Sequence, residues 1–257
     1  MNTDELSHLA KMISDLANSN LEQLKDKCQE EEDIQDYYLG ILQRQAILLW
    51  DLATLLKNRD SKYISTPYII LRSLLDDFLH LMYFHICKER DSEIIKVNAV
   101  AYKQSFVSLV NLTDSNYENF EGNYPFYLKR EEVEELKNNF ASKSENQKYF
   151  KVPSRFKFKE FMTFDTLVHR ISHSRKTKIY CDRAYYLWKE FSSFVHYSTY
   201  SFKMEMQNAP ENMHIIDESF QYCYNSVYLS FQYFVSEFEL KFIDNEMLNK
   251  RYGLILS

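Results

Sequence analysis

Residues 215–244 read IIDESFQYCYNSVYLSFQYFVSEFELKFID, and their apolar side chains recur every three or four positions. This spacing places one apolar face along several turns of an α-helix. The members of that face are Phe220, Cys223, Tyr224, Val227, Phe231, Phe234, Val235, Phe238 and Phe242. A helix with so long an apolar face must bury it against other helices, so this stretch predicts a helical bundle.

The same spacing recurs along the rest of the chain. Only 3 Gly and 4 Pro occur among 257 residues, which favours long helices over many short strands. Helices are predicted over residues 3–18, 34–55, 66–88, 92–112, 130–142, 157–173, 180–200 and 215–244, with loops at 113–127 and 143–155. The predicted fold is therefore all-α: a single-domain bundle of about seven to nine helices over residues 1–257, with residues 1–33 as an N-terminal helical extension within it.

Neither the beginning of the chain nor its cysteines indicate secretion. The first residues are acidic and polar where a signal peptide has a basic end and an apolar block. The four cysteines lie far apart without a C-x-x-C pair, which is typical of reduced cytosolic thiols. The most apolar run, residues 68–87, contains Arg72, Asp76 and Asp77, each costing about 2.5–3.5 kcal/mol at a bilayer centre. We therefore expect no membrane contact and a cytoplasmic protein.

Charge is distributed unevenly along this acidic chain. Residues 143–189 hold 12 Lys/Arg against 4 Asp/Glu, whereas residues 1–60 hold 6 against 12. A basic segment of this kind binds a phosphate backbone, pairs with acidic helices of the same protein or faces solvent. If it binds nucleic acid, the candidate surface consists of Lys157, Lys159, Arg170, Arg175, Lys176 and Lys178.

A polar stripe interrupts the predicted helix over residues 66–88. Arg72, Asp76 and His80 are four residues apart and therefore share one helix face, with Ser73 and Asp77 beside them. One interpretation is a structural ion pair between Arg72 and Asp76, or a solvated face. The other is an arginine that a carboxylate holds in place for binding a phosphate or another anion.

A second polar stripe surrounds His196 in the stretch FSSFVHYSTY, residues 191–200. On a helix, His196 shares its side with Ser192, Ser193 and Lys189, while Phe191 and Trp188 lie on the apolar side. A histidine titrates near neutral pH and transfers protons without a metal. His196 is therefore the candidate acid or base, and Ser192, Ser193 and His80 complete a candidate polar network.

No cofactor or metal is predicted. The three glycines are isolated, so no glycine-rich loop for phosphates is present, and no G-x-S-x-G elbow occurs. His169 and His173 have the i, i+4 spacing of two zinc ligands, but the sequence fixes no third ligand and lacks the glutamate of H-E-x-x-H.

Two stretches carry a family resemblance: LRSLLDDFLHLMYF at residues 71–84 and YCDRAYYLWKEFSSFVHYSTYSF at residues 180–202. Together they resemble an uncharacterised bacterial all-helical family with an early R-x-x-x-E helix and a late S-x-x-x-H helix. More distantly, the chain resembles the HEPN superfamily of small helical bundles, which includes metal-independent ribonucleases of toxin-antitoxin and phage-defence systems. The resemblance places Arg72, Asp76, Ser192 and His196 at signature positions, with Asp76 where glutamate is more frequent.

These observations leave two hypotheses open. In the first, the chain cleaves or binds RNA, with His196 as general acid or base and Arg72, oriented by Asp76, stabilising the phosphate. In the second, the chain is a non-catalytic interaction module whose Arg/Asp/Ser/His set fixes helix packing. The HEPN spacing R-x4-6-H is absent, because Arg170 and His173 are too close, and this favours the second hypothesis. Expected partners are RNA, a protein encoded nearby and a second copy of the chain in a homodimer.

Overall fold

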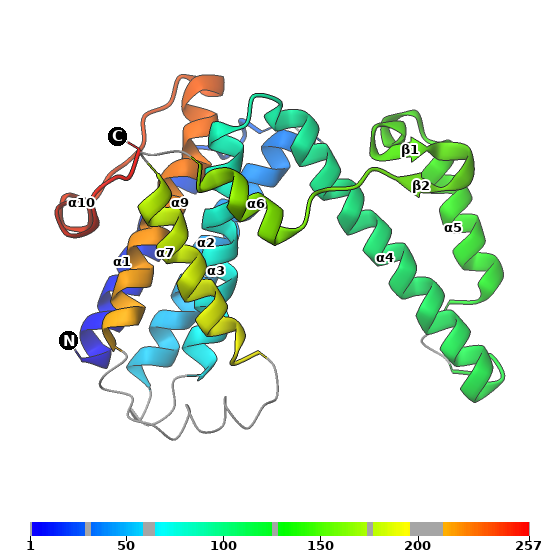
Figure 1. Ribbon diagram of the computed structural model, residues 1–257, viewed down its shortest axis with the longest axis horizontal. Coiled ribbons are helices and arrows are strands. Elements are labelled where there is room, and N and C mark those ends of the chain that lie inside the picture. Colours follow the sequence, from blue (N-terminus) through cyan, green and yellow to red (C-terminus); the bar gives the residue numbers. More distant parts are fainter. Residues whose placement is uncertain are drawn as a thin grey trace. The chain divides into compact units, whose positions relative to one another are not determined.

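The computed structural model describes residues 2–28, 32–58, 65–124, 128–173, 177–195 and 213–256. Within these ranges the chain forms nine α-helices and one two-stranded hairpin (Figure 1). The all-α prediction is therefore confirmed. The chain divides into two compact units: a first unit of Met1–Lys88 and Thr163–Ser257, and a second unit of Glu89–Met162. The single domain over residues 1–257 stays a prediction.

The first unit is a helical bundle centred on α3 and α9. Its helices are α1 (Thr3–Glu22), α2 (Asp33–Lys57), α3 (Ser65–Ile86), α6 (Phe164–Ile171), α7 (Lys178–Ser192), α9 (Met213–Phe238) and α10 (Glu246–Tyr252). Helix α3 packs against α2, α6, α7 and α9, and α9 also contacts α1 and α2. The bundle therefore brings α3, which carries the first polar stripe, next to α7, which leads to the second.

Local sequence signals define where α1 begins and how it packs. Asn2 and Glu5 form a reciprocal capping box, which satisfies amide groups that the first turn leaves free. On the buried side, Ser7 and Ser14 donate hydrogen bonds to backbone carbonyls of α2, at 2.7 and 2.6 Å. Small serines allow this close approach, so α1 is packed into the bundle along its length.

The apolar face of α9 is buried as its spacing predicts, but the helix is shorter than expected. Phe220, Val227, Phe231 and Phe234 are fully buried. The prediction of a helix to residue 244 is wrong, because α9 ends at Phe238 and the next residue has a left-handed φ of 53°. The chain then turns to α1, where Asn20 exchanges two hydrogen bonds with the backbone of residue 243.

The second unit consists of two helices and a hairpin around an aromatic core. Its elements are α4 (Arg90–Phe120), α5 (Arg130–Ser142), η1 (Ser144–Tyr149), β1 (Phe150–Val152), η2 (Pro153–Arg155) and β2 (Lys157–Phe158). The antiparallel strands pair Phe150 with Phe158, which pack with Ala99 and Tyr149 in the core. Helix α5, η1 and β2 all contact α4.

Two predicted boundaries are wrong in and next to this unit. Residues 113–120, predicted as part of a loop, continue α4, which ends at Phe120 before Glu121 takes a left-handed φ of 53°. Residues 157–163, predicted as helical, form β2 and an extended segment, and α6 begins after the Thr163 cap. The left-handed residue Glu121 caps the end of α4, and the Thr163 side chain caps the start of α6 by accepting from the Thr166 N–H.

One helix in the described ranges, α2, has the length and mean hydropathy of a membrane span. The apolar window is 44% buried inside the first unit, and a core helix of a soluble protein passes the same test. The expectation of a cytoplasmic protein without membrane contact stays a prediction.

Candidate functional site

Arg72 on α3 is oriented by two residues of α7. Its Nε donates a hydrogen bond of 2.9 Å to Oγ of Ser192, and its guanidinium carbon lies 4.8 Å from the centre of the Trp188 ring. Ser192 is itself fixed, because its hydroxyl donates to the Trp188 carbonyl at 2.7 Å. Within the described part of the chain, the two terminal nitrogens of Arg72 have no hydrogen-bond partner. The half-buried guanidinium is thus held at one edge while its terminal donors stay available for an anion.

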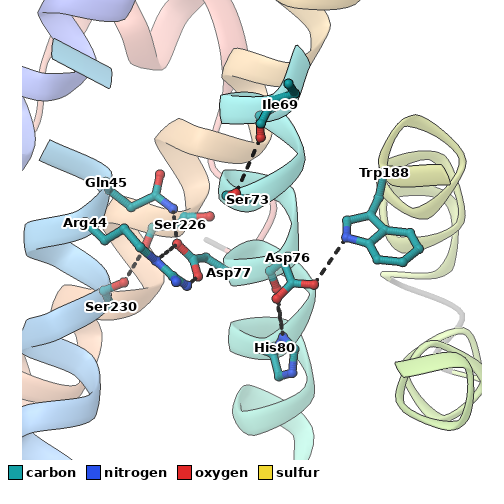
Figure 2. A network of polar contacts seen from close by, with 10 residues as sticks. All are labelled: Arg44, Gln45, Ile69, Ser73, Asp76, Asp77, His80, Trp188, Ser226 and Ser230. Atoms are coloured by element: carbon teal, nitrogen blue, oxygen red, sulfur yellow. Dashed lines mark hydrogen bonds and ion pairs between the residues drawn. The ribbon is translucent and has the colours of Figure 1, made fainter. Parts of the chain in front are cut away.

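Asp76 follows one turn later and contacts the same tryptophan (Figure 2). Trp188 donates its ring N–H to Oδ1 of Asp76 at 3.2 Å, and Nδ1 of His80 lies 3.6 Å from Oδ2. The same Nδ1 lies 2.9 Å from the Asp76 carbonyl oxygen. The predicted ion pair between Arg72 and Asp76 does not form between these two described residues; the two side chains meet at the Trp188 ring instead.

Trp188 is the residue that sequence reasoning missed at this site. The Trp188 ring is half-buried, in agreement with its predicted place on the apolar side of the helix. Its ring N–H also donates a hydrogen bond to Asp76, and its ring face contacts the Arg72 guanidinium. An available signal is its position four residues before Ser192, because this spacing makes Trp188 a neighbour of the polar side at the border with the apolar side. A tryptophan combines a large apolar surface with one donor, so it fits between a core and a polar stripe.

Asp77, the neighbour of Asp76, has a different environment. It is 1% exposed and faces α2, where Nε of Arg44 donates at 3.0 Å and Nε2 of Gln45 at 3.1 Å. The Arg44 Nη2 also contacts the other carboxylate oxygen. Figure 2 shows Asp76 and Asp77 pointing to opposite sides of α3. Asp77 therefore links α3 to α2 inside the bundle, while Asp76 belongs to the half-exposed site toward α7.

His196, the candidate acid or base, lies outside the described residues. Of its predicted neighbours, Ser193 lies just after α7 and donates its hydroxyl to the Glu190 carbonyl at 2.7 Å. Lys189 lies with its ammonium 4.6 Å from the centre of the Tyr185 ring. The structure thus brings Arg72, Asp76, His80 and Ser192 to one interface between α3 and α7, and the position of His196 there stays a prediction.

The predicted nucleic-acid surface is divided between the two units. Lys157 and Lys159 belong to the second unit, whereas Arg170 and Lys178 belong to the first. Arg170 donates to the Tyr83 hydroxyl at 3.3 Å, and Lys178 lies 3.8 Å from the Asp182 carboxylate. Arg175 and Lys176 lie outside the described residues. A single surface formed by all six residues stays a prediction.

A second charged cluster joins α7 to the beginning of α9. Arg183 binds Glu218 through two hydrogen bonds of 2.5 and 2.7 Å. Burial raises the pKa of the nearby Glu190 above its usual value, against the lowering influence of Arg183 and His214, and the Glu218 carboxylate raises it further. A carboxylate whose charge is disfavoured in this way makes the α7–α9 interface sensitive to pH.

No group of three His, Cys, Asp or Glu side chains in the described ranges is arranged to hold a metal ion. The ring centres of His169 and His173 are 4.5 Å apart, but Nδ1 of His173 lies 2.6 Å from the His169 carbonyl oxygen. Cys181, the cysteine that follows these histidines in the sequence, is fully buried, and that burial raises the pKa of its thiol to about 12. A thiol held neutral in this way is a poor metal ligand.

Comparison of the chain with protein-family models, with curated proteins and with solved structures yields no match. The function must therefore be argued from the site itself.

Proposed function

We propose that this chain is a HEPN-like RNA-directed protein of a bacterial defence or toxin-antitoxin type system, in which Arg72 binds an RNA phosphate. The observation that carries the proposal is the geometry of Arg72. Its Nε is occupied by Ser192 and its face by Trp188, while its two terminal nitrogens have no partner within the described part of the chain. A guanidinium fork presented in this way matches the two oxygens of a phosphate.

Cleavage in this proposal proceeds without a metal. His196 removes the proton of a ribose 2′-hydroxyl, and the 2′-oxygen attacks the adjacent phosphorus while the bond to the 5′-oxygen breaks. The 5′-oxygen takes a proton from water as it leaves, and the proton held by His196 returns to solvent. The products are a 2′,3′-cyclic phosphate and a free 5′-hydroxyl. Arg72 stabilises the negative charge that develops on the phosphate oxygens between these states. Trp188 contacts Arg72 through its ring face and Asp76 through its ring N–H, and within the described part of the chain no ion pair joins the carboxylate to the arginine donors.

The test is an RNA cleavage assay in the presence of a chelator, with thermal unfolding measured in parallel. Arg72→Ala and His196→Ala are expected to abolish cleavage while the melting temperature changes little. Arg251→Ala is a matched control, because Arg251 is an exposed arginine on α10 that pairs with Asp217 and is not part of the candidate site or surface. Cleavage that persists in Arg72→Ala or His196→Ala contradicts the proposal.

A second candidate function is a non-catalytic interaction module, and a specific observation favours it. Two hydrogen bonds cross from α3 to α7 at this site, from Arg72 to Ser192 and from Trp188 to Asp76. Such bonds fix the register of two packed helices, which is a sufficient reason for these residues. In that case no RNA is cleaved, and Ser192→Ala, Trp188→Phe and Arg72→Ala each chiefly lower the melting temperature.

A further inference from the structure

The second unit contains an aromatic groove that the site on α3 and α7 does not use. It lies between α4, α5 and the hairpin, has a volume of about 310 Å³ and is built entirely within the second unit. Its lining consists of Lys103, Phe106, Val107, Val110, Asn111, Lys137, Phe156 and Phe158. A groove of this size, largely apolar and with a few polar groups at its walls, has the character of a ligand site.

Phe156 occupies this groove at a conformational cost. Its φ is 50°, in the left-handed region that costs an ordinary residue about 1–2 kcal/mol. Its ring packs edge-on against Phe106 and Phe158, at 5.0 Å between centres in both cases, and remains half-buried. Strained backbone of this kind is concentrated at binding sites, where it holds a side chain in a required position. Here it keeps one aromatic ring at the groove wall.

The charges around the groove favour an anion. Lys103 is exposed and has no acidic partner among the described residues, while Lys137 is bound to Glu134 at 2.6 Å. The hairpin adds basic side chains, because residues 146–159, which lie between Glu145 and Glu160, include five basic and no acidic residues. Lys151, Arg155 and Lys157 are exposed there without an acidic partner in the described ranges.

We propose that this groove binds a nucleotide of single-stranded RNA, its base against Phe156 and Phe106 and its phosphate at Lys103 and Lys137. Aromatic platforms next to lysines are the usual means by which proteins bind single strands, because every base has a face that stacks. Asn111 at the wall offers a donor and an acceptor to a base edge. The inference rests on the proposed RNA-directed function and adds to it a binding site in the other unit.

The test measures binding of a fluorescein-labelled single-stranded RNA of twelve nucleotides to the full chain by anisotropy, with the same sequence as a duplex for comparison. Phe156→Gly removes the ring and accepts the positive φ, but it also removes ring packing against Phe106, Phe150 and Phe158. Thermal unfolding is therefore measured beside binding, and the Kd is compared at a temperature at which the variant is folded. We expect at least about a tenfold weaker Kd for this variant, given the usual effect of removing one stacking ring. Phe120→Ala is the control, since this ring is 49% exposed on α4 outside the groove.

Lysine variants give the second arm. Lys103→Gln is expected to weaken binding and to reduce its salt dependence, and Glu134→Gln, which frees Lys137, is expected to strengthen binding. Unchanged affinity in both Phe156→Gly and Lys103→Gln overturns the inference, as does the absence of RNA binding. A dimer in sedimentation that Phe156→Gly converts to a monomer also overturns it, because a second copy then covers the groove.

This test separates the groove from the site on α3. If RNA is cleaved in an Arg72-dependent manner while groove variants bind normally, the proposed function stands and the groove inference fails. If groove variants lose binding while Arg72→Ala binds RNA normally and no cleavage occurs, the groove inference stands and the proposed function fails.

Discussion

Asp76 and Asp77 are adjacent on α3, and their replacement should have very different effects on stability. Asp77→Ala removes a carboxylate that is 1% exposed and is bound by Arg44 and Gln45. Asp76→Ala removes a carboxylate whose side chain is 35% exposed and which accepts a hydrogen bond from the Trp188 ring N–H. The pair is a matched comparison, because the residue type, the helix and the substitution are the same.

The expected loss for Asp77→Ala is about 3 kcal/mol in the free energy of unfolding. Removing one partner of a buried ion pair costs about 3–5 kcal/mol, since the other is left buried and unpaired. The lower end applies because the Arg44 side chain is 50% exposed and regains water. Gln45 is fully buried, and the substitution also removes the acceptor of its amide nitrogen. The amide oxygen of Gln45 already has no hydrogen-bond partner among the described residues. For Asp76→Ala, a half-exposed group, the expected loss is about 0–1 kcal/mol.

Urea unfolding followed by circular dichroism measures both losses. Thermal unfolding should show a melting temperature about 6–12 °C lower for Asp77→Ala, at roughly 2–4 °C per kcal/mol for a chain of this size. Asp77→Asn keeps the shape and an acceptor, so its loss should lie between those of the two alanine variants. Equal losses for Asp76→Ala and Asp77→Ala would refute the assignment of one carboxylate to the core and the other to the site.

Three further predictions follow from particular contacts. Because the folded state raises the pKa of Glu190 above its usual 4.5, stability contributed at this group falls as pH rises from about 4.5 through the raised pKa. In urea unfolding, the stability of Glu190→Gln relative to the original chain should therefore increase as the pH rises from about 4.5 through the raised pKa, and a difference that does not change with pH would contradict this. Asn225→Ala should increase hydrogen exchange at Ile255, because Asn225 is 1% exposed and binds the backbone of Gly253 and Ile255, whereas unchanged exchange would disprove the docking. Gly122→Ala should lower the melting temperature of the chain, because φ is +77° and an added Cβ would lie 3.0 Å from the Tyr117 ring; an unchanged value would contradict the strained turn.

The apolar spacing of the sequence predicts the helical architecture. It does not predict where α9 ends or that residues 157 and 158 form a strand. The apolar spacing of residues 215–244 correctly predicts a buried helix face, because burial of α9 depends on its own sequence period. Its end at Phe238 depends on contacts of the following segment with Asn20, more than two hundred residues away. Likewise, residues 157 and 158 pair with β1 because their aromatic neighbours share a core, which no helical period reveals.

The sequence predicts that Arg72 and Asp76 belong to the candidate site, but not which residues they contact. The i, i+4 spacing of Arg72 and Asp76 suggested that they bind each other. In the structure each contacts α7 instead, since packing of α3 on α7 brings Trp188 between them. The spacing of residues within one helix predicts which side chains share a face. Which residues that face contacts depends on how the helices pack in the folded chain.

The central claim, that Arg72 beside Trp188 binds RNA phosphate, can be tested through the fluorescence of Trp188 itself. The chain has two tryptophans, and Trp50→Phe leaves Trp188 as the single reporter, 4.8 Å from the Arg72 guanidinium. Titration with single-stranded RNA is predicted to change its emission in a saturable manner, and Arg72→Gln is predicted to abolish that change. RNA binding by anisotropy without any change in Trp188 emission, or with the same change in Arg72→Gln, would contradict the claim.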